Sequence, residues 1–165
     1  MATPPHDAVN KLPLLLRSLV LPFVAGAVGS AATYPNLSSW YDTLEKPAFS
    51  PPKAVFGPAW TTLYLLMGTS HYLLQKQAAE PSAKRAANIL YGLQLVLNAL
   101  WSILFFARRA LGAVLIEVLF LWVSIVLTII AFARISPLAA LLLVPYLLWT
   151  AFAAVLNAAL WRLNR

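Results

Sequence analysis

The sequence contains no cysteine, and charged residues make up only 10% of it. Without cysteine the chain has no disulfide, no thiolate nucleophile and no cysteine-ligated metal site. Soluble domains carry about 25% charged and roughly 45–50% apolar residues, whereas hydrophobic residues make up 61% of this chain. This imbalance excludes an ordinary soluble domain and predicts a protein that lies in a lipid bilayer.

The sequence also lacks the short motifs of common catalysts. It has no glycine-rich phosphate loop, no paired-carboxylate site and no nucleophile elbow. We therefore expect neither hydrolysis nor phosphoryl transfer, and we expect no cofactor. His71 has no second histidine, cysteine or acid at ligand spacing, so we expect it to form hydrogen bonds near the membrane interface and not to bind a metal or haem.

Five apolar segments are each long enough to cross a bilayer, whose core of about 30 Å takes about 20 helical residues. They span residues 12–33, 52–75, 86–106, 111–133 and 137–160. The joints after the second, third and fourth segments are short, so these neighbouring helices are expected to run antiparallel. We predict an all-α protein with one membrane domain over residues 1–165, a bundle of five transmembrane helices.

The first segment resembles a secretory signal, because Lys11 precedes an apolar run that ends in small residues. That run is longer than the hydrophobic core of a usual signal, and it contains Arg17 and Pro22. We therefore expect a retained first helix, with cleavage as the alternative.

The net charge of +7 would suggest a nucleic-acid partner in a soluble protein. Here the basic residues stand at the ends of apolar segments, where they anchor helices to lipid headgroups, so we expect no nucleic-acid partner. One end collects Lys11, Arg17, Lys76, Lys84, Arg85 and Arg134, and the other collects Lys46, Lys53, Arg108, Arg109, Arg162 and Arg165. This even division gives no orientation in the membrane.

Residues 34–51 form the one long connection, and we predict a structured loop there. Its aromatic residues suit the headgroup region, and its prolines stiffen the approach to the next helix. The loop is predicted to act as a lid over one end of the bundle, through Trp40, Lys46, Pro47, Pro51 and Pro52. The alternative is a passive turn at the membrane interface.

Polar and aromatic residues follow one face of two segments. The third segment places Gln94, Asn98, Trp101 and Phe105 at helical spacing, and the fifth does the same with Tyr146, Trp149, Ala153 and Asn157. Amides that face lipid are unfavourable, so both faces are expected to point inward, beside Trp60 and Tyr64 of the second segment. Together they predict an aromatic pocket with a few polar groups, suited to a small molecule. The alternative is a solid core.

Glu117 is the one acid well inside an apolar segment. An acid within the membrane is a candidate functional residue. It lies within about 10 Å of the start of its segment at 1.5 Å per residue. Because Arg108 and Arg109 lie on the same membrane side, a structural salt bridge is at least an equal interpretation, and so is a side chain that extends to the membrane interface.

At these motifs the sequence resembles the translocator protein family, also called tryptophan-rich sensory proteins or peripheral-type benzodiazepine receptors. The resemblance covers nearly the whole chain and rests on ordered motifs in the first loop and in all but the first helix. Its main residues are Trp40, Tyr41, Leu44, Lys46, Pro47, Pro51, Pro52, Phe56, Trp60, Gln94, Asn98, Trp101, Arg109, Pro145, Tyr146, Trp149, Asn157, Trp161 and Arg162.

The resemblance implies a five-helix pocket for hydrophobic ligands, closed on one side by the first loop. It implies porphyrins as ligands in many members, and cholesterol or benzodiazepine-type drugs in animal ones. Carried over residue by residue, the pocket is lined by Trp60, Asn98, Trp101, Trp149, Ala153 and Leu156, with Gly29, Ser30 and Phe56 nearby. A homodimer in a bacterial envelope membrane or the mitochondrial outer membrane is also implied.

The sequence departs from the family at four tryptophan positions, where it has Ala48, Phe49, Ala54 and Ala113. Its aromatic surface for a tetrapyrrole is therefore thinner. Asn157 is followed by two alanines where a cholesterol-associated pattern needs a tyrosine, so sterol binding through that segment is not expected.

We expect a membrane receptor for hydrophobic small molecules, above all porphyrins, that acts in tetrapyrrole or stress-linked regulation. Two alternatives stay open. One is light- or oxygen-dependent breakdown of porphyrin with Trp149 as redox partner, and the other is transport of the same ligands across the bilayer. The sequence has no internal repeat, which disfavours an inverted-repeat transporter.

Overall fold

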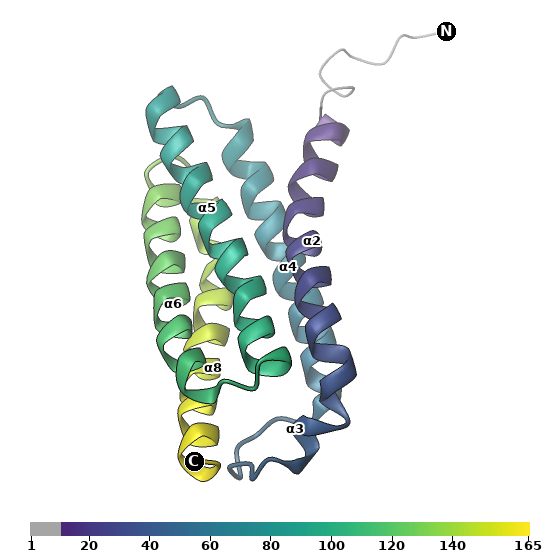
Figure 1. Cartoon of the computed structure of the whole chain (residues 1–165). Coiled ribbons are helices and arrows are strands. Elements are labelled where there is room, and N and C mark those ends of the chain that lie inside the picture. The colour runs from purple at the N-terminus through teal and green to yellow at the C-terminus, as the bar shows by residue number, and fades with distance from the viewer. Residues whose placement is uncertain (1–10) are drawn as a thin grey trace, which may run out of the picture.

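The computed structural model describes residues 11–165, which form helices and connecting loops without a β-strand among them (Figure 1). The helices are α2 (Lys11–Leu37), α3 (Trp40–Thr43), α4 (Lys53–Lys76), α5 (Pro81–Ser102), η1 (Ile103–Ala107), α6 (Leu111–Ala133), α7 (Pro137–Leu141) and α8 (Val144–Leu163). η1 is a π-helical turn that continues α5, and a turn at residues 142–143 separates α7 from α8. The all-α prediction is confirmed.

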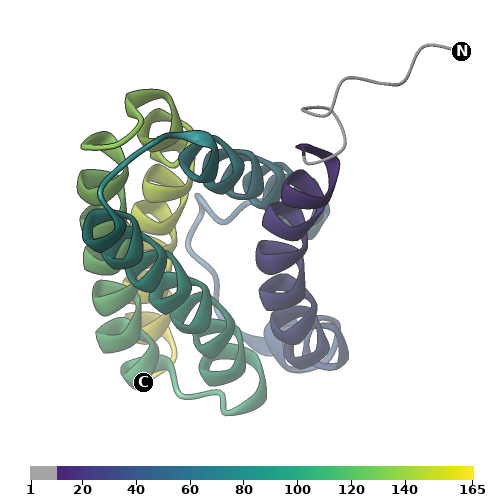
Figure 2. The same cartoon turned by 90° about the horizontal axis from the view of Figure 1, so that it is seen from above.

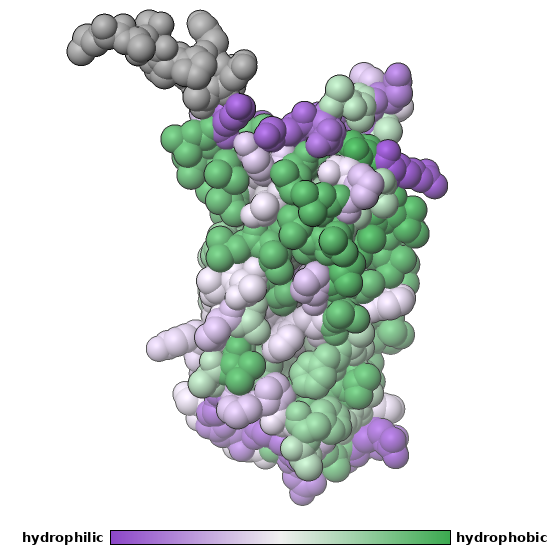
Figure 3. Space-filling model, turned by 180° about the vertical axis from the view of Figure 1, so that it is seen from behind, coloured by the Kyte–Doolittle hydropathy of each residue, from purple (hydrophilic) through white to green (hydrophobic). Residues whose placement is uncertain are grey.

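Four helical stretches are long and apolar enough to cross a membrane: Lys11–Leu37, Pro81–Ala107, Leu111–Ala133 and Pro137–Leu163. α4 has 24 residues, but it includes Ser70, His71 and Gln75 and is not among these stretches. The predicted count of five spanning helices is therefore not confirmed. On the face shown in Figure 3, the strongly hydrophilic residues gather at the two ends, and the surface between them is strongly hydrophobic in its upper part and mixed in its lower part. Charged residues at the ends of apolar helices are typical of an integral membrane protein.

Seen from above, the helices are arranged in a ring (Figure 2). α2 packs on α4 and closes the ring on α5 and η1, while α6 packs between α5 and α8. The core of the bundle includes Met67, Leu74, Tyr91, Ile125 and Phe132, which are almost fully buried. The loop between α3 and α4 crosses the end of the ring that holds the C-terminus (Figure 1).

The contact between α2 and α4 depends on Gly68. A Cβ placed on this glycine would lie 2.7 Å from a side-chain carbon of Leu19 and 2.8 Å from the Leu19 Cα. Helices in membranes approach closely where small residues leave room for the neighbouring backbone. Gly68 therefore allows α2 and α4 to pack tightly at this level.

Helix ends differ from the sequence prediction at three places. α2 runs to Leu37, past the expected end at residue 33, and side chains in its last turns bond back to backbone oxygens of the helix. α5 begins at Pro81 and not near residue 86, because proline suits the first turn of a helix, where its missing N–H needs no partner. The last predicted helix is divided into α7 and α8.

His71 is buried between helices, 7% exposed, five residues before the end of α4 at Lys76. Its Nδ1 lies 3.0 Å from Ser18 Oγ, its Nε2 lies 3.1 Å from Asn88 Oδ1, and its ring stacks on Tyr91. The hydrogen-bonding role is therefore confirmed, with partners on α2 and α5, and a position near the membrane interface stays a prediction. Within residues 11–165 no three His, Cys, Asp or Glu side chains gather as metal ligands.

Candidate ligand-binding cavity

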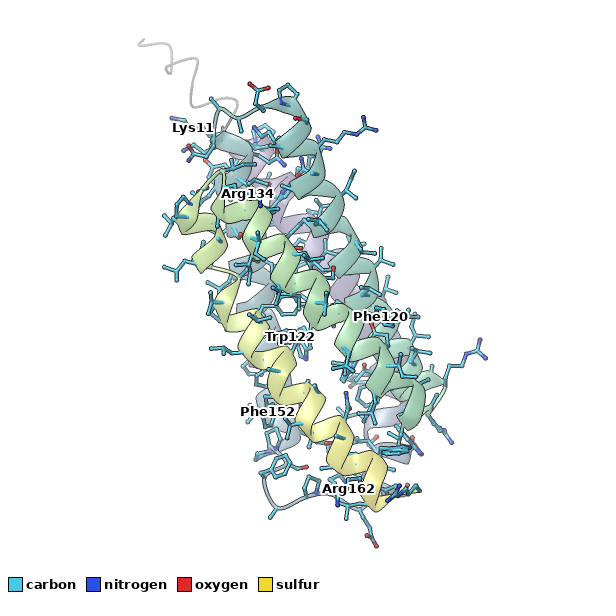
Figure 4. All side chains as sticks on the ribbon, turned by 90° about the vertical axis from the view of Figure 1, so that its left-hand side faces the viewer. Lys11, Phe120, Trp122, Arg134, Phe152 and Arg162 are labelled. Atoms are coloured by element: carbon cyan, nitrogen blue, oxygen red, sulfur yellow. The ribbon has the colours of Figure 1, made fainter. Side chains whose placement is uncertain are left out.

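A cavity of about 600 Å³ lies within the ring of helices, lined by residues of α2, α3, α4, α5, η1 and α8. Small-molecule sites typically have volumes of roughly 300–1,000 Å³. Figure 4 indicates the half of the bundle concerned: Phe152, which lines the cavity, lies toward the end marked by Arg162, away from Lys11 and Arg134. The solid-core alternative is therefore wrong for this half.

Aromatic rings of α4 and α8 form one wall of the cavity. Trp60 stacks on Tyr64 with ring centroids 5.4 Å apart and meets Trp149 edge-on at 6.4 Å. Trp149 also contacts Phe56 at 6.3 Å and Phe152 at 5.8 Å. Offset and edge-on pairs are the favourable arrangements of aromatic rings. The wall is therefore held in shape by its own contacts.

The end of α5 and the π-helical turn η1 form a second wall. Trp101 stacks on Phe105 with centroids 5.3 Å apart and ring planes 13° from parallel. Phe105 meets Phe106 edge-on at 4.7 Å, and both phenylalanines are buried and line the cavity. The sequence predicts an inward Phe105 from its helical spacing, but it gives no sign of the π-helical turn that places Phe106 beside it.

Nine of the ten residues predicted to bind a ligand line this cavity: Gly29, Ser30, Phe56, Trp60, Tyr64, Trp101, Trp149, Ala153 and Leu156. Asn98 does not line it. Its amide nitrogen donates to the Tyr146 hydroxyl at 3.1 Å, and its amide oxygen accepts from the Tyr64 hydroxyl at 3.4 Å. Asn98 therefore supports the aromatic wall from behind by joining α4, α5 and α8. Contact of the nine residues with a ligand stays a prediction.

The sequence prediction missed most of the residues that α2 contributes to the cavity lining. Phe23, Gly26, Ala27, Thr33 and Leu37 also line the cavity. Their signal in the sequence is weak, because α2 is apolar almost all round and carries no stripe of amides and aromatic rings. The small residues between positions 25 and 32 were the available hint, since small residues let other groups approach a helix closely.

The short helix α3 packs the first loop onto the bundle. Trp40 meets Phe105 edge-on at 5.5 Å, and Tyr41, only 4% exposed, contacts both Phe105 and Phe106. Burial and the neighbouring Asp42 carboxylate raise the pKa of the Tyr41 phenol above its ordinary value of 10.0. The start of the loop is therefore part of the folded core.

Lys46 fixes the turn that follows α3. Its Nζ donates to the backbone oxygens of Asp42 and Leu44, and it lies 4.9 Å from the centre of the Tyr41 ring. The other predicted lid residues, Pro47, Pro51 and Pro52, lie on the stretch that leads to α4. None of the five predicted lid residues lines the cavity, so their role as a lid stays a prediction.

Two side chains from elsewhere in the chain hold the loop. Asn164 accepts a hydrogen bond from the Glu45 N–H and donates one to the Glu45 carbonyl, both at 2.9 Å. Arg109 donates to Asn36 Oδ1 at 3.3 Å and lies over the Trp40 ring. Arg109 has a φ of 54°, a backbone conformation uncommon outside glycine. The loop is therefore attached to the C-terminus and to the turn between η1 and α6.

Glu117 is buried in α6, and neither carboxylate oxygen has a hydrogen-bond partner within residues 11–165. The alternative of a salt bridge to Arg108 or Arg109 is wrong: within residues 11–165 the one ion pair joins Lys53 to Asp42, and Glu117 forms none. Glu117 also does not line the cavity. It belongs to the interior of the bundle, where α6 packs on α5 and α8.

Comparison with known proteins confirms the resemblance found in the motifs. The sequence matches the model of the TspO/MBR family over residues 18–162. It is 40% identical over 158 residues to the tryptophan-rich protein TspO of Chlorobaculum tepidum, a match that covers 94% of this chain and 99% of that protein. It is 41% identical over 138 residues to the translocator protein of Homo sapiens, covering 83% of this chain and 82% of that protein. It is 37% identical over 150 residues to the tryptophan-rich sensory protein of Cereibacter sphaeroides, covering 89% of this chain and 92% of that protein.

Proposed function

The chain belongs to the TspO/MBR family and is an integral membrane protein, and from this premise we propose that it is a receptor for porphyrins or similarly flat hydrophobic molecules. The observation that carries the proposal is the aromatic cavity beside the first loop. Its volume suits a small molecule, and its lining is mostly apolar with few polar groups, the usual composition of a ligand site. Binding would serve tetrapyrrole or stress-linked regulation.

Stacking on tryptophan supports a flat ligand over a flexible one. Trp60, Trp101 and Trp149 line the cavity and are only partly buried by the protein, so part of each ring is left for a ligand. An aromatic pair contributes about 0.5–1.5 kcal/mol beyond the burial of its surface. A planar macrocycle can meet rings from two walls at once, which a small flexible chain cannot.

The proposal includes five membrane crossings, with α4 as the fifth. A helix of 24 residues is roughly 36 Å long, enough for a bilayer core of about 30 Å. The polar groups that lower its apolar character are hydrogen-bonded: Thr61 and Thr62 donate to carbonyls one turn earlier in the helix, and Ser70 donates to the Ala139 carbonyl. Satisfied polar groups are tolerated within a membrane.

The site is tested by titrating the purified protein in a neutral detergent with protoporphyrin and following porphyrin absorbance. The double substitution Trp101→Ala with Trp149→Ala is expected to weaken binding by at least about tenfold, because it removes one stacking surface from each wall. Trp122→Ala is the matched control, since Trp122 is exposed on α6 and does not line the cavity (Figure 4). Wild-type affinity in the double variant would sink the assignment of the site.

A further inference from the structure

One charged side chain stands among the residues that line the cavity. Lys53, the first residue of α4, lines it together with apolar, aromatic and uncharged polar side chains. Its Nζ lies 2.6 Å from Asp42 Oδ2 on α3. The cavity therefore has an uncharged interior and a single cation, at the level where the first loop meets α4.

Two other basic residues in or beside the first loop, Lys46 and Arg109, are engaged by the protein itself. Lys46 is bonded to two backbone oxygens of its own turn, and Arg109 is held by Asn36 and the Trp40 ring. Neither of them lines the cavity. Lys53 is thus the cation within reach of a molecule in the cavity, with Asp42 as its one ion-pair partner in residues 11–165.

The pair between Lys53 and Asp42 is weakly held. The two side chains are 40% and 44% exposed. Ion pairs at this exposure contribute about 0–1 kcal/mol, because water and salt compete with them. An anionic group that arrives from the cavity side can therefore replace Asp42 as the partner of Lys53 at little energetic cost.

The other polar groups that line the cavity are uncharged, so none of them offers an anion the charge that Lys53 does. Three of them, Trp101 Nε1, Asn157 Nδ2 and the Tyr41 hydroxyl, are buried and have no hydrogen-bond partner within residues 11–165. Thr33 and Thr61 donate their hydroxyls to backbone oxygens of Gly29 and Gly57 in their own helices. The aromatic walls suit an apolar body. The charge and the apolar surface therefore lie in different parts of one site, which matches a molecule with a flat apolar body and an anionic edge.

We propose that Lys53 binds a carboxylate of the ligand, and that Asp42 is the ion-pair partner of Lys53 while no ligand is bound. The cavity then selects flat hydrophobic molecules that carry a carboxylate over uncharged ones of the same shape. The inference rests on the proposed function, because it names the chemistry of a ligand of that same cavity. Asp42 lowers the affinity for the anionic ligand by competing with it.

Two ligands of nearly the same shape test this selection. Protoporphyrin carries two carboxylates, and its dimethyl ester carries none, so the ratio of their dissociation constants measures the contribution of charge. The wild-type protein in a detergent with an uncharged headgroup is expected to prefer the acid roughly three- to tenfold. This preference is expected to fall as salt is added, because exposed charges are screened.

The substitutions Lys53→Gln and Asp42→Asn are expected to act in opposite directions. Lys53→Gln reduces the affinity for the acid to that for the ester, and Lys53→Arg restores the preference. Asp42→Asn raises the affinity for the acid and leaves that for the ester unchanged. Lys46→Gln is the matched control from the same loop, and it is expected to leave the ratio unchanged.

The outcomes separate this inference from the function on which it rests. If both porphyrins bind but Lys53→Gln keeps the wild-type ratio, or Asp42→Asn weakens the binding of the acid, the role of Lys53 is overturned and the receptor function stands. If neither porphyrin binds the wild-type protein, the proposed function is overturned and this inference with it. Because the Lys53 and Asp42 side chains are exposed, the variants are expected to melt at the temperature of the wild-type protein, and melting curves check that each is folded.

Discussion

At the scale of single residues, two glycines of α4 have opposite surroundings. A Cβ added at Gly57 would meet no heavy atom within 4 Å, whereas one at Gly68 would lie 2.8 Å from the Leu19 Cα and 3.1 Å from the Ser18 carbonyl oxygen. Backbone atoms of a packed helix cannot move aside as a flexible side chain can. Gly68 therefore serves the contact between helices, and Gly57 leaves the cavity open.

The substitution Gly68→Ala is expected to lower the free energy of unfolding by about 1–3 kcal/mol, because the added methyl group overpacks the contact with α2. Gly57→Ala is the matched change in the same helix. It is expected to cause no loss, and up to about 1 kcal/mol of gain, because alanine favours a helix over glycine. Thermal unfolding in detergent, followed by circular dichroism, compares the two. Equal destabilisation by both would contradict the difference in packing.

Asn98 illustrates what a sequence can and cannot say about one side chain. Its helical spacing with Gln94 and Trp101 correctly predicts that it faces inward, because an amide in lipid needs a partner. The identity of the partner depends on α4 and α8, which are distant in the sequence. The amide is bonded to two tyrosine hydroxyls and does not line the cavity.

Replacement of Asn98 by leucine is expected to lower the free energy of unfolding by about 1–2 kcal/mol, because the buried Tyr146 hydroxyl loses its partner. Adding Tyr146→Phe is expected to recover part of this loss, since removing both members of a hydrogen bond leaves fewer unpaired groups. A double-mutant cycle on melting curves measures the coupling. Simple additivity of the two single losses would show that the two side chains are not coupled.

At the scale of elements, the first loop is held unevenly along its length. Its beginning, α3, is packed on the phenylalanines of η1. The stretch from Glu45 to Pro52 is attached to the C-terminal end by two hydrogen bonds between the Glu45 backbone and the Asn164 side chain. Phe49 in this stretch also contacts Phe152 edge-on. We therefore expect the later part of the loop to open more readily than α3.

Asn164→Ala is expected to speed hydrogen exchange of the Glu45 amide by about tenfold, because it removes two hydrogen bonds that together contribute about 1–2 kcal/mol. The Tyr41 region is expected to keep its protection. Arg165→Ala is the control from the adjacent position, since Arg165 contacts Trp161 and not the loop. An unchanged exchange rate at Glu45 in the Asn164 variant would mean that the two hydrogen bonds of Asn164 do not hold the loop.

Elements differed in how well the sequence predicted them. Long apolar runs located the long helices, because a bilayer demands about 20 apolar residues per crossing. The π-helical turn at Ile103–Ala107 has no such signal, since it departs from a regular helix without a glycine, a proline or a change in composition. The break between α7 and α8 has one that the prediction of a single helix did not use: Pro145 lies in the first turn of α8, and a proline inside an apolar run ends or kinks a helix.

At the scale of the whole molecule, short connections predicted antiparallel neighbours, but they could not predict which distant helices meet. The ring closes where α2 packs on α5 and η1, and this contact joins segments far apart in the chain. The cavity is a property of the closed ring, so the sequence suggested its aromatic walls on α4, α5 and α8 but missed most of α2. The homodimer implied by the family resemblance stays a prediction.

The central claim is that a flat hydrophobic ligand occupies the aromatic cavity inside the ring. The most direct test is a protoporphyrin titration of the Gly57→Phe variant, because Gly57 lines the cavity, a Cβ added there would meet no heavy atom within 4 Å, and a phenyl ring at a lining position competes with a ligand for space. We predict at least a tenfold loss of affinity with an unchanged or higher melting temperature. Wild-type affinity in this folded variant would contradict the claim and place the ligand elsewhere on the protein.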